Sequence, residues 1–150
     1  MRIIIQRVSE ASVRIEGNIS AQIGPGLLIL LGIIEDDTQE DIDWLVGKIT
    51  RMRIFADDDG KMNKCLQDID GQLLVVSQFT LHAGTRKGNR PSFIKAARPE
   101  TAIPLYQAFL KTAQDVTGEA CAAGEFGADM QVSLVNDGPV TIMLDSQLRE

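Results

Sequence analysis

The sequence predicts an α+β fold with a mostly antiparallel sheet. Strand-like runs and a hairpin signal open the chain, two amphipathic helical segments stand apart at about 38–52 and 100–116, and two more strand-like runs close it. Strands and helices that segregate in this way are typical of an α+β architecture. With 150 residues, 44% of them apolar, the chain is long enough for one hydrophobic core, so we expect a single domain over residues 1–150.

The predicted strands differ in how their apolar residues are spaced. RIIIQRV (2–8) is a short β-rich run, and alternating runs flank Gly17 and Asn18, where we expect a hairpin turn. GLLILLGI (26–33) is apolar on both faces, which predicts a strand covered on two sides. GQLLVVSQFTL (71–81) predicts a second buried strand that ends in polar residues, and DMQVSLV and VTIMLD are the last two strands.

The two predicted helices have start and stop signals. Thr38-x-x-Asp41 resembles a capping box at the start of the first helix, which runs from about 38 to 52. The second helix spans about 100–116 and is followed by Gly118, a residue type that commonly ends helices. Its expected apolar side consists of Ile103, Leu105, Tyr106, Phe109 and Leu110.

The motifs of common nucleotide and metal sites are missing from the sequence. Gly24, Gly26 and Gly32 do not form a dinucleotide fingerprint, because the GxG precedes the strand, and we expect turn roles for them. There is no Walker loop, GxSxG elbow, HExxH motif or cluster of histidines, so we expect neither a metal nor a cofactor. Cys65 and Cys121 are isolated in sequence, which favours buried free thiols over a disulfide or a zinc site.

The charge distribution leaves one place for a nucleic acid. A net charge of −6 argues against such a partner, yet the segment GTRKGNRPSFIKAAR (84–98) contains no carboxylate. Its cations are Arg86, Lys87, Arg90, Lys95 and Arg98. The segment is either a solvated loop or a phosphate-facing patch. Because the sequence has no apolar run of about 18 residues and no signal-peptide pattern, we expect a cytoplasmic protein that does not contact a membrane.

Two short stretches are candidates for chemistry. SQFT (77–80) lies where a predicted strand leaves the sheet, and a nucleophilic Thr80 there would need a base within hydrogen-bond reach. The only histidine is His82, and a lone histidine beside a loop is more often solvent-facing than catalytic. In NDGPVT (136–141), Pro139 follows a turn-like NDG. Proline lacks the N–H of a returning strand, so this stretch is either a chain reversal at a sheet edge or a backbone device, including a cis peptide.

Taken together, these motifs resemble the D-aminoacyl-tRNA deacylase family. The matching segments are IIIQRVSEASV (3–13), GPGLLILLGI (24–33), RIFADDDGKMN (53–63), SQFTL (77–81), RKGNRPSF (86–93) and FGADMQVSLVNDGPVT (126–141). The family hydrolyses the ester that joins a D-amino acid to the 3′ end of tRNA, as a proofreading activity of translation. The resemblance implies a barrel-like core with two main helices, a homodimer whose active site crosses the subunits, and an aminoacyl-tRNA substrate without DNA as a partner.

The resemblance also implies roles for individual residues. The backbone N–H groups around Phe79 and Thr80 would bind the developing oxyanion, with Ser77 and Gln78 shaping that pocket, while the terminal ribose 2′-OH assists attack by water. The Gly138–Pro139 peptide would be cis and would reject L-amino acids in the other subunit, so glycyl-tRNA is expected to be cleaved as well. The substrate-binding residues would be Arg7, Ala102, Phe126, Gly127 and Met130, and those that meet tRNA phosphates would be Arg86, Lys87 and Arg90.

Two other functions remain open on the residues alone. A non-catalytic RNA-binding or ligand-binding module could use the same hydroxyl-rich strand end and basic loop, and the missing acid–base side chains favour it. A hydrolase of small esters or amides that uses Thr80 and His82 would be active without RNA. For Ala102, Phe126 and Met130 the alternative is an ordinary place in the hydrophobic core.

Overall fold

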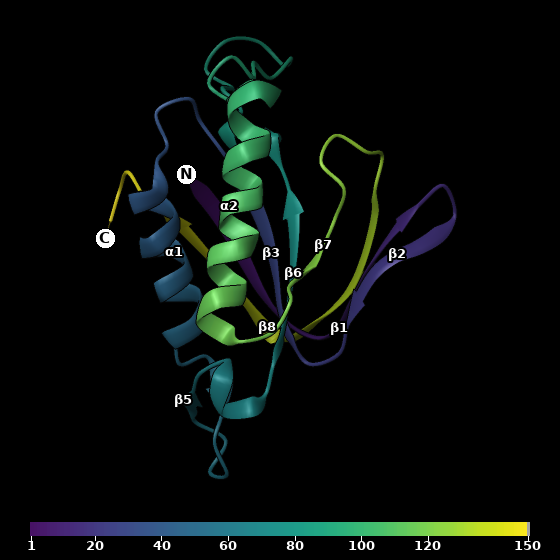
Figure 1. Ribbon diagram of the computed structural model, residues 1–150, viewed down its shortest axis with the longest axis vertical. Coiled ribbons are helices and arrows are strands. Elements are labelled where there is room, and N and C mark those ends of the chain that lie inside the picture. The colour runs from purple at the N-terminus through teal and green to yellow at the C-terminus, as the bar shows by residue number, and fades with distance from the viewer. Residues whose placement is uncertain (150) are drawn as a thin grey trace.

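The computed structural model describes residues 1–149, in which two helices pack on one face of a strongly curved sheet (Figure 1). The strands are β1 (Arg2–Ile15), β2 (Asn18–Ile23), β3 (Gly26–Gly32), β4 (Phe55–Ala56), β5 (Met62–Lys64), β6 (Gln72–Ser77), β7 (Ala122–Ala123) and β8 (Gln131–Asp145). The helices are α1 (Gln39–Arg51) and α2 (Pro99–Thr117), with short 3-10 turns η1 (Gln67–Ile69) and η2 (Phe79–His82). The main sheet has the order β2-β1-β3-β6-β7, and β8 pairs with β1.

The long strand β1 organises this sheet. It is antiparallel to β2, β3 and β8, whereas β3, β6 and β7 run parallel to one another. The predicted α+β fold with a mostly antiparallel sheet is therefore confirmed. The parallel part follows from the crossover through α1, because two parallel neighbours need a long connection between them.

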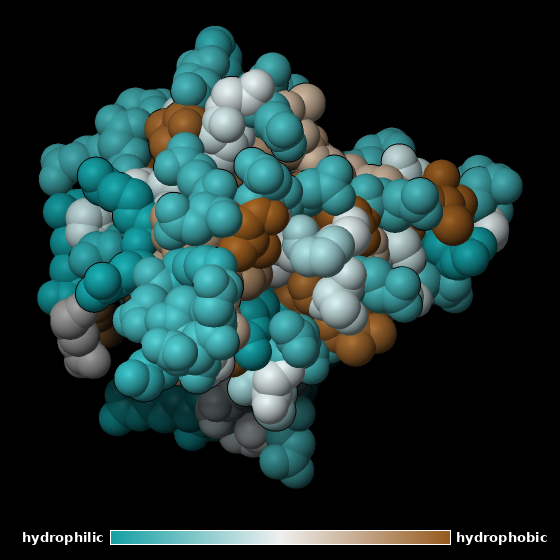
Figure 2. Space-filling view, turned by 90° about the horizontal axis from the view of Figure 1, so that it is seen from below, coloured by the Kyte–Doolittle hydropathy of each residue, from teal (hydrophilic) through white to brown (hydrophobic). Residues whose placement is uncertain are grey.

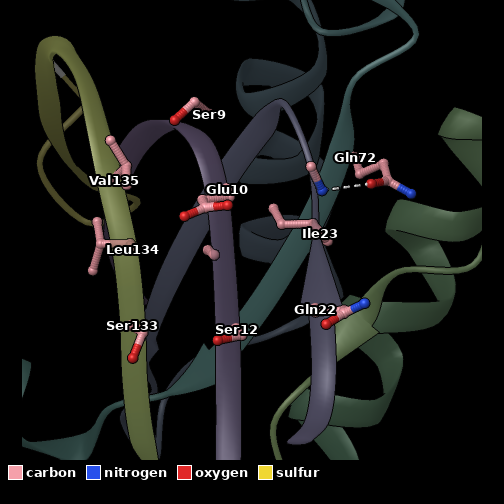
Figure 3. Close-up of a pocket in the computed structure, with 11 residues that line it drawn as sticks. Ser9, Glu10, Ser12, Gln22, Ile23, Gln72, Ser133, Leu134 and Val135 are labelled. Atoms are coloured by element: carbon pink, nitrogen blue, oxygen red, sulfur yellow. Dashed lines mark hydrogen bonds between the residues drawn. The ribbon is translucent and has the colours of Figure 1, made fainter.

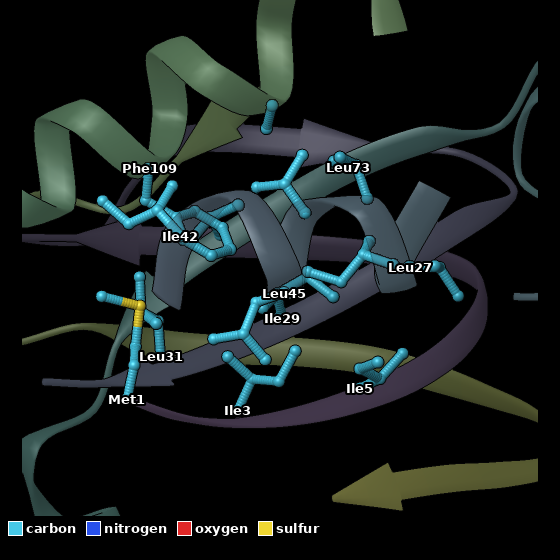
Figure 4. Close-up of a cluster of buried hydrophobic side chains, with 14 of the residues drawn as sticks. Met1, Ile3, Ile5, Leu27, Ile29, Leu31, Ile42, Leu45, Leu73 and Phe109 are labelled. Carbon is cyan, nitrogen blue, oxygen red and sulfur yellow. The ribbon is translucent and has the colours of Figure 1, made fainter. Parts of the chain in front are cut away.

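The curvature of the sheet creates two hydrophobic clusters. The larger one lies between the sheet and both helices, where Ile3, Ile29, Leu45 and Phe109 pack together (Figure 4). The smaller one lies inside the curl of the sheet and consists of Val8, Ala11, Val13, Ile23, Leu28, Leu74 and Val76. Strand β3 contributes to both clusters, which explains why its sequence is apolar on both faces.

The helices begin and end as their sequences predict. The Thr38 amide donates to Asp41 Oδ2 at 2.8 Å at the start of α1, and Gly118 ends α2 with φ +79°. The expected apolar side of α2 is partly wrong, because Ile103 is 37% exposed while Ala102 is buried. At this point α2 packs against the sheet through Ala102 and not through Ile103.

Two predictions about turns are also wrong in detail. Ile15 pairs with Asn18, so the hairpin turns at Glu16 and Gly17, both with positive φ, which suits the twist of a two-residue turn. Gly26 and Gly32 lie within β3 and serve close packing instead of turns. A Cβ on Gly26 would lie 2.0 Å from the Gln72 carbonyl oxygen on the neighbouring strand.

NDGPVT does not reverse the chain, because β8 is one continuous strand from Gln131 to Asp145. Its pairing with β1 continues on both sides of the motif. Asn136 pairs with Val8 and Thr141 with Gln6, so five steps along β8 face only two along β1. The motif is therefore a bulge that projects extra backbone from a paired strand.

Two further expectations concern exposure. Cys65 and Cys121 are free, but both are partly exposed instead of buried. No helix within residues 1–149 is both long enough and apolar enough to cross a membrane.

Candidate active site

A pocket of about 320 Å³ opens at the ends of β3 and β6, beside the first turn of α2. The predicted site residues that line it are Ser77, Gln78, Phe79, Ala102, Phe126, Gly127 and Met130. They come from three segments that are far apart in the sequence: the end of β6, the start of α2 and the loop before β8. The structure thus places half of the fourteen expected site residues in one hollow, and Thr80 lies outside its lining.

The turn η2 presents free backbone donors next to this pocket. The Gln78 amide donates to the Leu31 carbonyl oxygen at 2.7 Å, which ends the pairing of β6 with β3. Within residues 1–149, the amides of Phe79 and Thr80 donate to no other group. They are the first amides of a helical turn, which have no partner inside the turn itself. These two N–H groups can bind an oxygen atom of a ligand.

The hydroxyl of Thr80 is not placed for activation by His82. Gln78 Nε2 donates to Thr80 Oγ1 at 2.5 Å, and no hydrogen bond joins Thr80 and His82 among the described residues. The expectation that His82 faces solvent is wrong, because this residue is 7% exposed and its Nε2 atom has no partner within residues 1–149. Burial lowers the pKa of His82, since desolvation disfavours the charged imidazolium. The arrangement does not support a Thr80/His82 dyad.

Two aromatic rings, those of Phe79 and Phe126, line the pocket. Phe79 and Phe93 pack edge to face with centroids 5.1 Å apart, and Phe93 lies at the end of the basic loop. Phe126 packs against Tyr106 at 6.0 Å. Phe79 is 56% exposed, so its ring is available at the mouth of the pocket.

Tyr106 is a supporting residue that the sequence did not single out. Its hydroxyl lies 2.9 Å from the carbonyl oxygens of both Val75 and Gly124, and the Gly124 amide donates to the same Val75 oxygen at 2.9 Å. These contacts fasten the segment before Phe126 to β6. Burial raises the pKa of Tyr106 to about 12, so the hydroxyl stays protonated. A polar tip within an apolar helix face was the only signal in the sequence.

Glu35 is a second supporting residue that sequence reasoning missed. Its carboxylate accepts from the Arg98 amide and from Thr101 Oγ1, both at 2.7 Å, at the start of α2. The hydrogen bond from the Arg98 amide is the main reason that the pKa of Glu35 is lowered. The carboxylate thus occupies the N-terminus of the helix that carries Ala102.

The Gly138–Pro139 peptide bond is cis and lies against Arg7. Arg7 Nε donates to the Asp137 carbonyl oxygen at 3.0 Å, and its Nη1 donates to the Ile54 carbonyl oxygen at 2.6 Å. A Cβ on Gly138 would lie 2.6 Å from Arg7 Nη2, and the φ of this glycine is +122°. Only glycine fits between the bulge and the guanidinium in this conformation.

This bulge lies far from the pocket of its own chain. Asn136 pairs with Val8, which pairs with Gly26 at the start of β3, whereas the pocket is lined by Leu31 near its end. The five residue steps from Gly26 to Leu31 span about 16 Å at the usual rise of a strand. Gly138, Pro139 and Arg7 therefore do not join the other predicted residues within one chain.

The basic loop adjoins the pocket on the side of η2. Gly84 and Ser92 exchange backbone hydrogen bonds of 2.7 and 2.9 Å, which close the base of the loop. Arg86, Lys87 and Arg90 are exposed on it. Figure 1 shows this loop beyond the N-terminal end of α2, the same end that borders the pocket.

A larger hollow of about 620 Å³ lies elsewhere, between β1, β2 and β8 (Figure 3). Ser9, Glu10, Ser12 and Ser133 line it together with amide side chains and apolar residues. None of the predicted site residues contributes to it. Size alone thus does not select the candidate site, and the smaller pocket is the one that combines free amides, two aromatic rings and adjacent cations.

Comparisons with known proteins show the family to which this chain belongs. The family model described as D-Tyr-tRNA(Tyr) deacylase matches residues 4–145. Proteins called D-aminoacyl-tRNA deacylase from Flavobacterium johnsoniae and Akkermansia muciniphila are 61% and 62% identical over 150 residues, with complete coverage of both chains.

Solved structures give the same result for the fold. A chain called c-Myc DNA Unwinding Element Binding Protein aligns with a TM-score of 0.91 and 42% identity, covering 97% of this chain and 98% of its own. A probable eukaryotic D-amino acid tRNA deacylase aligns with a TM-score of 0.82 and 17% identity, covering 95% and 97%, which bears on the fold alone. From the family model and the full-length relatives, we conclude that this chain belongs to the D-Tyr-tRNA(Tyr) deacylase family.

Proposed function

We propose that this protein hydrolyses the ester bond of D-aminoacyl-tRNA and thereby removes D-amino acids before they reach translation. The observation that carries this proposal is the pocket beside η2, where two free amides adjoin aromatic walls in a member of this family. Within residues 1–149, the only side chain hydrogen-bonded to the Thr80 hydroxyl is the neutral carboxamide of Gln78, which is neither an acid nor a base. Catalysis then depends on positioning and on the stabilisation of developing charge.

The chemical step is attack by water on the ester carbonyl carbon. As the new C–O bond forms, the carbonyl oxygen gains negative charge, which the amides of Phe79 and Thr80 stabilise by donating hydrogen bonds. The bond from this carbon to the ribose 3′-oxygen then breaks, and a proton from the water passes to that oxygen. The neighbouring 2′-OH of the tRNA assists the proton transfer, so Thr80 acts as a positioning residue. The products are a D-amino acid and a tRNA with a free 3′ end.

The proposed selection against L-amino acids uses the Gly138–Pro139 bulge of a second subunit. Both hands of an amino acid carry the same groups, so attraction alone discriminates poorly, and a rigid obstacle is needed where an L side chain would lie. Main-chain carbonyls of a bulge that Arg7 holds at the Asp137 carbonyl oxygen suit this task, because they accept hydrogen bonds from an α-ammonium group and exclude a side chain. Glycine has no side chain to exclude, so glycyl-tRNA is also a substrate.

Two features of the chain support a homodimer. The bulge lies about 16 Å along the sheet from its own pocket, so a second copy must supply it if it is to meet the substrate. Within residues 1–149, strand β8 pairs with β1 alone, and its Val135 and Met143 side chains are 50% and 62% exposed. Figure 2 shows apolar side chains exposed in groups among hydrophilic ones on one face of the molecule. Such a surface can pack against a second copy.

The tRNA partner contacts the protein in two places. Phe126 and Gly127 hold the terminal adenine, while Ala102 and Met130 lie near the aminoacyl group. The exposed Arg86, Lys87 and Arg90 meet phosphates of the acceptor stem. A small basic patch on a protein with a net charge of −6 implies weak binding that salt weakens further. The cytoplasm, where tRNAs are charged, is the compartment that fits this substrate.

The decisive experiment measures release of amino acid from D-tyrosyl-tRNA and L-tyrosyl-tRNA incubated in parallel with the purified protein. Cleavage of the D-ester alone supports the proposal, and cleavage of a glycyl ester under the same conditions supports the proposed selection. A protein that protects the D-ester from spontaneous hydrolysis is a binding module, which refutes the enzymatic proposal. Equal cleavage of both esters refutes the selection mechanism but leaves an esterase.

Mixing two strongly impaired variants tests the cross-subunit site. Gly138→Val damages the bulge, and Phe79→Pro removes an amide from the pocket, so each homodimer has two damaged sites. After subunit exchange, about half of the dimers are mixed, and each has one site that contains an intact pocket and an intact bulge. Recovery of about a quarter of the wild-type activity supports the shared site. No recovery despite proven exchange shows that each chain works alone.

A further inference from the structure

The turn η2 has few hydrogen bonds of its own, so other elements must fix its position. Inside the turn and at its end, the Leu81 amide donates to the Gln78 carbonyl oxygen at 3.2 Å and the Ala83 amide to that of Thr80 at 3.1 Å. A 3-10 turn of only four residues, whose hydrogen-bond geometry is poorer than that of an α-helix, is not rigid by itself. Its two free amides can stabilise an oxyanion only if their direction is held constant.

Arg2 holds one end of this turn. Its Nη1 atom donates to the Leu81 carbonyl oxygen at 2.7 Å. The same guanidinium is fixed by Asp145, whose Oδ2 atom accepts from Arg2 Nε at 3.0 Å and from Nη2 at 2.8 Å. The backbones of Arg2 and Asp145 also pair directly, across β1 and β8. The Arg2 side chain that reaches η2 is thus held by Asp145 at its guanidinium, and its backbone is held by strand pairing.

The surroundings keep this ion pair formed. The Asp145 side chain is only 10% exposed and that of Arg2 is 32% exposed. Burial alone would raise the pKa of Asp145, but hydrogen bonds from Arg2 and from the Gln147 amide outweigh it, so the pKa lies below its usual value. The carboxylate is therefore ionised at neutral pH. Removing one member of a partly buried ion pair therefore destabilises the protein more than removing one member of an exposed pair.

Gly32 of β3 lies in close contact with η2. It pairs with Arg2 across β1 and β3. A Cβ at Gly32 would lie 3.0 Å from the Gln78 carbonyl oxygen, from Leu81 Cβ and from His82 Cδ2. The turn therefore packs directly on the backbone of β3, and a methyl group at Gly32 would displace it by a few tenths of an ångström. The position of η2 is thus fixed by one residue from each of three neighbouring strands: Arg2 of β1, Gly32 of β3 and Asp145 of β8.

We propose that Arg2 and Asp145 are positioning residues for ester hydrolysis, which hold η2 on Gly32 so that the amides of Phe79 and Thr80 keep a fixed direction toward the substrate. The proposal rests on the function proposed above. Neither residue touches the substrate, because both act through the Leu81 carbonyl oxygen. Small displacements of catalytic groups have large effects on rate, so the loss of this support reduces turnover more than binding.

The test compares Arg2→Met and Asp145→Asn with a matched exposed pair. Lys111 and Asp115 form an ion pair on the surface of α2, at 2.8 Å, with side chains that are 75% and 62% exposed. We expect Arg2→Met to lower kcat for D-tyrosyl-tRNA by about 10- to 100-fold with KM changed less than about threefold. Asp145→Asn should act in the same direction, with partial recovery in Asp145→Glu. Lys111→Met and Asp115→Asn should leave both constants unchanged.

A second measurement does not depend on enzymatic activity. Hydrogen exchange of the Leu81 and Ala83 amides, followed by NMR, should become faster in Arg2→Met and in Gly32→Ala but not in Lys111→Met. All variants are compared where denaturant unfolding shows them fully folded. If the wild-type protein cleaves no ester, the proposed function fails, and exchange alone decides whether η2 is held as described. Unchanged kcat, a rise in KM alone, or unchanged exchange in folded Arg2→Met overturns the proposal.

Discussion

Replacing Phe79 with proline removes one of the two free amides without requiring a new backbone conformation. Phe79 is the first residue of η2, a position where proline is tolerated because its missing N–H has no partner inside the turn. The preceding Gln78 has φ −144° and ψ 80°, outside the helical region that a following proline disfavours. The variant therefore changes the proposed oxyanion donor while leaving the chain path intact.

The expected effect can be separated from the loss of the aromatic ring. Both Phe79→Pro and Phe79→Ala lose the edge-to-face contact with Phe93, worth about 0.5–1.5 kcal/mol, but only the proline variant loses the N–H group. Loss of one donor to an oxyanion lowers kcat by about 100-fold, or roughly 2.7 kcal/mol of transition-state stabilisation. The Thr80 amide remains, so activity should fall without vanishing.

Single-turnover release of D-tyrosine from D-tyrosyl-tRNA measures this difference. Thermal unfolding of both variants provides the control for folding. The reasoning is refuted if folded Phe79→Pro turns over as fast as Phe79→Ala. It is also refuted if the two variants differ only in KM, because the amide would then serve ground-state binding.

Three further predictions concern other residues. Tyr106→Phe leaves the Gly124 carbonyl oxygen without its buried donor, so urea unfolding should show a loss of about 1–2 kcal/mol, and KM should rise because Phe126 is held less firmly. His82 has a lowered pKa in the folded state, so the unfolded chain binds the proton more readily. The free energy of unfolding should therefore fall as pH drops below about 6.5, and His82→Phe should lack this part of the pH dependence. Lys87→Ser and Arg90→Ser should raise KM for tRNA substrates and flatten its dependence on salt, whereas a short aminoacylated oligonucleotide without the acceptor stem should show no such change.

Local patterns in the sequence were enough to place the main elements. The capping residues Thr38 and Gly118 and the doubly apolar run of β3 depend on neighbours a few residues away, so they can be recognised without the fold. Turn details were less certain. Gly32 looks like a turn glycine in the sequence, but its lack of a side chain matters because η2, about fifty residues later, rests on it.

In the candidate site, too, some features follow from local sequence and others from contacts between distant segments. SQFT was predicted at the end of a strand, and the resemblance to a family implied that Phe126, Gly127 and Met130 belong near it; the structure places these residues in one pocket. Glu35, Tyr106 and Arg2 were missed, because each acts on a backbone group far away in sequence. A charged or hydroxyl side chain has no local signature for such a partner. The predicted exposure of His82 was wrong for the same reason, since its burial comes from packing against Gly32.

By itself, the sequence determined the two helices with their approximate ends, the strands β1, β2, β3 and β6, and which motifs resemble the family. The tertiary structure decided how β8 pairs with β1, and thereby that NDGPVT is an exposed bulge and not a hairpin turn. It also decided which distant segments line the pocket and that Gly138 lies away from it. The physical reason is that helix and strand formation depends on side chains close in sequence, whereas pairing register and cavities depend on the packing of the whole chain.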